Sequence, residues 1–96
     1  MAFPDFLKVK YGKEIVFSVI NLNWANISEI EKRLLNEKIL YKNSNYEREN
    51  EKINEVIYEI TDKVYINLSY EGSFITIYYP IEKINEVKLF LKKTKL

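Results

Sequence analysis

Residue types that support catalysis are scarce in this sequence. It has no cysteine and no histidine, which excludes disulfides, thiolate metal sites, a cysteine nucleophile and the commonest general base. No serine has a recognisable base near it, and only two glycines are present. Because both glycines fall at expected turns, no glycine-rich phosphate loop can be built from them. We therefore expect a non-catalytic protein that carries no cofactor.

One row of carboxylates has a regular spacing. Glu51, Glu55 and Glu59 would share one face of a helix, where their oxygens could bind Mg²⁺ or Ca²⁺. Lysines lie nearby in the sequence, however, and no loop supplies carbonyl ligands at a recognised spacing. We expect no metal site here.

Aromatic residues alternate with short polar residues along two segments that a hairpin would pair. One face of this hairpin would carry Tyr65, Asn67, Ser69, Glu71, Phe74, Thr76 and Tyr78. Exposed rings of this kind stack on nucleobases, and they also favour the centre of protein interfaces. The alternative is that a helix covers this face. We predict that Tyr65, Phe74 and Tyr78 bind a partner protein or a second copy of the chain.

The only tryptophan, Trp24, lies in the polar segment Asn21–Asn26. A tryptophan in such a loop either anchors a partner or closes the core. We include Trp24 among the predicted partner-binding residues.

The C-terminal segment is basic, with five lysines and two glutamates in residues 81–96. Lys88, Lys92 and Lys93 are candidates for phosphate contacts, which makes nucleic-acid binding the alternative function. The net charge of the whole chain is only +1 and gives no general electrostatic reason for such binding.

Length and composition indicate one domain, residues 1–96, with enough apolar residues (47%) to fill a core. No segment approaches the roughly 20 apolar residues that span a bilayer, so no membrane association is expected. The start Met-Ala-Phe-Pro-Asp does not resemble a signal peptide, and we expect a cytoplasmic location. The abundance of Ile, Asn, Lys and Tyr favours a low-GC genome, such as that of an archaeon, a virus or a mobile element.

Two hairpins are predicted around the glycines. Gly12-Lys13 would join strands 6–11 and 14–22. Strand 14–22 is apolar on both faces and should lie inside the sheet, whereas strand 6–11 resembles an edge protected by lysines.

The second hairpin would turn at Gly72-Ser73, between strands 64–71 and 74–79. A two-residue loop pairs Leu68 with Ile77. This register separates an apolar face from the polar and aromatic face described above.

Helices are predicted where a short motif recurs. Glu-Lys-Ile-Asn-Glu-Val occurs at 51–56 and at 82–87, and a looser copy begins at Ile27. Each copy places apolar residues at i, i+3 and i+7, which is one face of a helix. We predict a first helix from Asn26, capped by Asn26 and Glu29, to about residue 36.

Two further helices follow from the other copies. One would cover residues 46–60, although a strand over 54–60 that turns at 61–63 is the competing interpretation. The last would begin at Pro80 and continue through Leu91. A short strand at 38–42 is also predicted.

These elements predict an α+β fold. It would have a mostly antiparallel sheet of four to five strands, with two or three helices packed on one face and the order ββα(β)αββα. Helices on one face would leave the aromatic face for a partner. The expected function is that of a small interaction module, such as an adaptor, an assembly subunit or an inhibitor, and a homodimer is expected.

Overall fold

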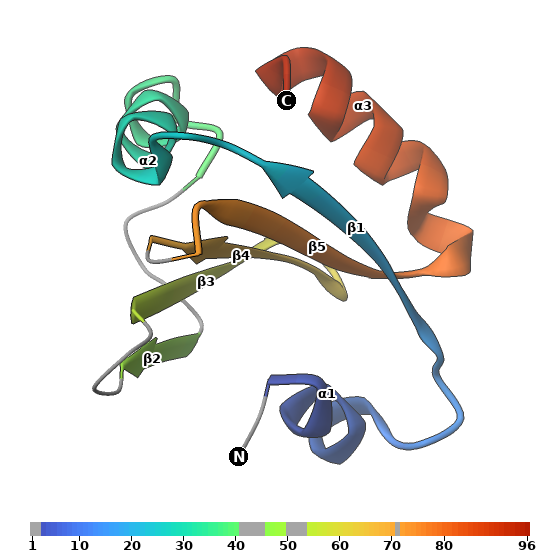
Figure 1. Cartoon of the computed structure of the whole chain (residues 1–96). Helices are drawn as coiled ribbons and strands as arrows, with labels where there is room; N and C mark the ends of the chain where they lie inside the picture. The colour runs from blue at the N-terminus through green and yellow to red at the C-terminus, as the bar shows by residue number, and fades with distance from the viewer. Residues whose placement is uncertain (1–2, 41–45, 50–53, 71) are drawn as a thin grey trace.

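The computed structural model describes residues 3–40, 46–49, 54–70 and 72–96. Its elements follow in the order α1 (Phe3–Tyr11), β1 (Phe17–Asn23), α2 (Ile27–Asn36), β2 (Tyr46–Glu49), β3 (Asn54–Thr61), β4 (Val64–Ser69), β5 (Phe74–Pro80), a 3₁₀ turn (Ile81–Lys83) and α3 (Ile84–Thr94). The strands form one antiparallel sheet in the order β1-β5-β4-β3-β2 (Figure 1). The predicted α+β class and antiparallel sheet are confirmed.

Helices α2 and α3 cover one face of the sheet (Figure 1). The core between them and the sheet contains Ile27, Ile30, Leu34, Tyr58, Val64, Ile66, Leu68, Ile75, Ile77, Tyr79, Val87 and Phe90. Arg33 joins the two helices by donating from Nη2 to the carbonyl of Thr94, at 2.6 Å. Two helices therefore share one face, as predicted.

Helix α1 packs on the opposite face, where a strand was predicted at 6–11. Leu7 is buried against Ile57 and Tyr65. In a strand, Val9 would share the inward face with Leu7, but here Val9 is 72% exposed. Pro4 lies in the first turn, where its missing N–H costs nothing. Gly12, with φ +87°, ends the helix by donating its N–H to the carbonyl of Lys8. Gly12 is thus a helix-terminating glycine rather than a hairpin glycine.

The predicted helix over 46–60 is also wrong, and the competing strand interpretation is right. Residues 46–49 form β2 and residues 54–61 form β3. A tight turn then leads into β4, with Lys63 at φ 63°. Ile57 and Tyr58 are both buried although they point to opposite faces, and this two-sided burial is typical of a strand inside a sheet.

Strand β1 lies at an edge of the sheet, not inside it as predicted. The segment expected to pair with it, 6–11, is helical, so among the described strands β5 is its only neighbour. Its apolar residues on both faces contact different layers. Ile20 and Leu22 pack on the α2–α3 side, and Phe17 packs on the α1 side.

The hairpin between β4 and β5 is confirmed, but its register differs by two residues. Leu68 pairs with Ile75 rather than with Ile77. The connection begins after Ser69, and the positive φ falls on Ser73, at 53°, instead of on Gly72. A Cβ on Gly72 would lie 2.2 Å from the ring of Phe74, so this glycine is required by close packing. A shift of two keeps the predicted faces.

Helices α2 and α3 lie where the first and last of the three predicted helices were expected. Asn26 caps α2 by accepting a hydrogen bond from the N–H of Glu29, at 3.1 Å, and α2 ends at Asn36 as expected. Pro80 ends β5, and a 3₁₀ turn separates it from α3. Residues 37–40 form turns rather than the start of a strand, and residues 41–42 lie outside the described residues.

The packing of α1 can be tested with two substitutions in the same helix. Leu7→Ala should lower the free energy of unfolding by about 2–5 kcal/mol, because it leaves a cavity at a buried site. Val9→Ala should change it by less than about 0.5 kcal/mol, since Val9 is exposed. Denaturant unfolding measures both. Equal effects from the two substitutions would contradict this placement of α1.

Candidate protein-binding interface

Helix α1 covers the part of the predicted aromatic face that contains Tyr65. This side chain is fully buried, in a cluster with Leu7 and Ile57 that Phe6, Tyr11, Phe17 and Tyr78 border. Its ring therefore supports α1 and is not available to a partner while α1 is in place. This is the helix-covered alternative considered for the face.

Hydrogen bonds fix the end of α1 over this cluster. Lys10 donates to the hydroxyl of Tyr65 at 3.2 Å, and the hydroxyls of Tyr65 and Tyr11 lie 2.6 Å apart. Tyr11 also donates to Glu59 Oε2 at 3.3 Å. Either hydroxyl of the Tyr11–Tyr65 pair can be the donor. The ammonium of Lys10 lies 5.4–5.9 Å from the ring centroids of Phe6, Tyr11 and Tyr65, within range of cation–π attraction.

Two tyrosines have pKa values above the ordinary range. Burial, helped by its hydrogen bonds to Tyr11 and Glu59, raises the pKa of Tyr65. Burial and the carboxylate of Glu31 raise the pKa of Tyr70. Glu31 on α2 accepts hydrogen bonds from both Tyr58, at 2.9 Å, and Tyr70. Both raised pKa values belong to tyrosines that hold helices on the sheet, and neither hydroxyl ionises near neutral pH.

The remaining predicted partner-binding residues are divided between the two faces of the sheet and the two ends of β5. Tyr78 is half-buried at the border of α1, and Phe74 is half-buried against Gly72 at the far end of β5. The side chain of Trp24 is half-buried against the α2–α3 core. The backbone N–H of Trp24 donates to the backbone carbonyl of Ser73 at 2.9 Å. These residues do not form one aromatic patch.

The candidate phosphate-binding lysines lie across the sheet from Tyr65 and Tyr78. Lys88, Lys92 and Lys93 are exposed on α3, which packs on the face of the sheet opposite to Tyr65 and Tyr78. A nucleic acid would have to reach around the molecule to contact both sets.

The described residues contain no group of three or more acidic side chains that could hold a metal ion. Glu51 lies outside them, while Glu55 and Glu59 are on β3. No helix within the described ranges is long and apolar enough to cross a membrane.

The two edges of the described sheet differ in charge. Three of the four described residues of β2 are charged: Glu47, Arg48 and Glu49. Strand β1 has seven residues, Phe-Ser-Val-Ile-Asn-Leu-Asn, and none is charged. Val19 within this strand is 48% exposed, and Val16 directly before it is 77% exposed. Edge strands of natural proteins are usually short, charged or covered, so β1 has the properties of a strand that another chain pairs with.

The backbone groups on the open side of β1 can be assigned from its register. Trp24 donates to the carbonyl of Ser73, and hydrogen-bonded pairs alternate along an antiparallel ladder. Ser18, Ile20 and Leu22 therefore bond to β5, opposite Tyr79, Ile77 and Ile75. Pro80, which has no N–H, lies opposite Phe17, in agreement with this assignment. The N–H and C=O groups that point outward are those of Phe17, Val19, Asn21 and Asn23.

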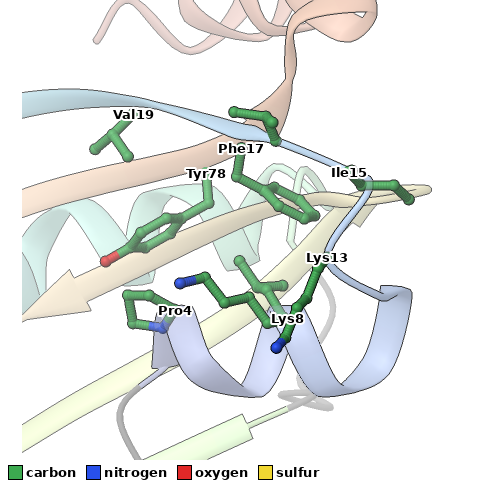
Figure 2. A pocket seen from close by; sticks show the side chains of 9 residues that line it. Pro4, Lys8, Lys13, Ile15, Phe17, Val19 and Tyr78 are labelled. Carbon is green, nitrogen blue, oxygen red and sulfur yellow. The ribbon is translucent and has the colours of Figure 1, made fainter.

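A largely apolar pocket opens between α1 and β1, with a volume of about 270 Å³. Its lining residues are Pro4, Leu7, Lys8, Lys13, Ile15, Val16, Phe17, Val19 and Tyr78. Phe17 and Tyr78 point from the sheet toward α1, and Lys8 and Lys13 lie on the α1 side (Figure 2). The pocket therefore lies directly beside the open edge.

Of the predicted site residues, only Tyr78 lines this pocket. The sequence interpretation missed Val16, Val19, Lys8 and Lys13. One signal was present, because no charged residue occurs between Ile15 and Ser28. That uncharged run was interpreted as a strand inside the sheet, where both neighbours belong to the same chain and no partner protein is needed.

Comparison of this chain with family models, with curated proteins and with solved structures finds no match. Its function must therefore be argued from the edge strand and the pocket.

The two tyrosine pKa shifts predict a pH dependence of stability. A raised pKa favours the neutral form in the folded state, so this contribution is complete below about pH 10, the ordinary tyrosine pKa. It is lost as the pH rises further. We expect the unfolding free energy to fall less steeply above that pH in the variant Tyr65→Phe/Tyr70→Phe than in the wild type.

Tyrosinate absorbance gives a second measurement. In the native protein some of the eight tyrosines should ionise late, whereas in denaturant all should ionise near pH 10. Identical titrations of the native and denatured protein would contradict these shifts.

Proposed function

We propose that this protein is a small non-catalytic interaction module, which binds another protein or a second copy of itself by strand addition at β1. The observation that carries the proposal is the uncharged edge strand β1, with Val19 exposed within it and Val16 exposed directly before it. In this mode of binding, main-chain hydrogen bonds supply affinity and side-chain pockets supply specificity. Strand β1 offers outward backbone groups, and the pocket beside α1 borders them.

Two of the predicted partner-binding residues fit this interface. Tyr78 lines the pocket, and Trp24 directly follows β1. A second copy paired antiparallel about Ile20 would place Val19 of one copy opposite Asn21 of the other, in a continuous sheet. No charged residue of β1 would oppose such a pairing, so a homodimer is compatible with the proposal.

Nucleic-acid binding is less well supported. Tyr65 is buried under α1, and the lysines of α3 lie across the sheet from Tyr78. No described surface combines exposed rings with these lysines.

A charge placed on the edge tests the proposal. Val19→Lys should weaken association by roughly tenfold or more, since edge lysines oppose strand pairing. Self-association is measured by size-exclusion chromatography with light scattering, and partner binding by capture from the native host. The matched control is Val9→Lys, which adds the same charge at an exposed valine of α1 and should leave association unchanged.

A second substitution tests the backbone directly. Val19→Pro removes one outward N–H while leaving the bonds to β5, and proline is tolerated where an edge N–H faces solvent. Its expected effect is a roughly fivefold to tenfold weaker association, with circular dichroism unchanged. If Val19→Lys and Val19→Pro both associate like the wild type, strand addition at β1 is not the function.

A further inference from the structure

The pocket beside β1 has a composition that selects for a particular kind of partner segment. Its walls are mostly apolar, and among the described residues that line it only Lys8 and Lys13 are charged. Both lysines are exposed. Asp5 and Glu14 are close in sequence, yet neither lines the pocket. The site therefore combines an apolar cavity with uncompensated positive charge at its rim.

The position of the pocket determines which side chains of an added strand can enter it. Phe17 and Val19 point to the α1 face of the sheet, where they line the cavity (Figure 2). Residues of an added strand that lie opposite them point to the same face, because side chains directly across a ladder share a side. Every second residue of the segment would thus face α1.

The two lysines belong to different parts of the rim. Lys8 is on α1, and Lys13 follows the end of that helix. Figure 2 shows both on the α1 side of the cavity, below Phe17. Acidic residues placed on the α1 face next to a central apolar residue would lie near these ammonium groups, where opposite charges attract.

We propose that the strand added to β1 is an extended partner segment with an apolar residue between two acidic residues on one face, in the alternating pattern acidic-x-apolar-x-acidic. The apolar side chain enters the pocket, and the acidic side chains face Lys8 and Lys13. This inference rests on the proposed function, because it requires strand addition at β1. It excludes β1 of a second copy as the preferred occupant, since β1 carries no acidic residue.

Three short labelled peptides with blocked ends test this pattern by fluorescence anisotropy at low salt. The first is Thr-Asp-Thr-Leu-Thr-Asp-Thr. The second replaces both aspartates by lysine, and the third replaces the leucine by serine. The first should bind about tenfold more tightly than either of the others, and its affinity should fall as salt screens the charges.

Charge reversal on the protein provides the matched control. Lys8→Glu/Lys13→Glu should lose the preference for the acidic peptide and favour the lysine peptide. Lys88→Glu/Lys93→Glu makes the same change in net charge on α3, across the sheet, and should keep the wild-type preference. Since all four lysines are exposed, both variants should remain folded.

The outcomes separate this inference from the proposed function. Equal affinity for the acidic and lysine peptides overturns the inference about charge, and equal affinity for the leucine and serine peptides overturns the role of the pocket. If no peptide binds while Val19→Lys abolishes association, strand addition is supported and the inference fails. If no peptide binds and Val19→Lys has no effect, both fail.

Discussion

The burial of β4 on both faces is the constraint on which the rest of the structure depends. All six of its residues are buried, so the sheet must be covered on both sides. Helices α2 and α3 cover Ile66 and Leu68, and α1 is required over Tyr65. Because α1 has only nine residues, it covers part of its face. The pocket forms where this short helix meets β1.

The repeated motif shows how far local sequence determines the fold. Asn-Glu-Val belongs to strand β3 at residues 54–56 and to helix α3 at residues 85–87. The following residues decide between the two. Ile57-Tyr58-Glu59-Ile60-Thr61 is rich in β-branched and aromatic types, whereas Lys88-Leu89-Phe90-Leu91-Lys92 favours a helix with one buried side. The α+β class and helix α2 could be predicted from periodicity and capping. Strand β3 could not, because its conformation depends on pairing with β2 and β4.

The interface was less predictable, because it depends on strand order. Tyr78 and Trp24 were selected from residue type alone, without their relation to β1, so their part in the proposed interface stays a prediction. In segment 6–11, Leu7 and Tyr11 fit the inner side of either a strand or a helix, and only packing on Tyr65 distinguishes them. Once this segment is helical, β1 loses its expected neighbour and becomes an edge. Val16 and Val19 are exposed for that reason. Their exposure depends on where a distant segment packs, which a short sequence pattern does not show.

The same helix links stability to binding. A helix of nine residues is marginal in isolation, so α1 depends on its contacts with the sheet. Its last turn is held by the hydrogen bonds of Lys10 and Tyr11 around Tyr65, whereas Pro4, Leu7 and Lys8 line the pocket. A segment that pairs with β1 and fills this pocket would contact both the sheet and α1. Such a ligand binds only when α1 is docked, and by linkage it must stabilise that docking.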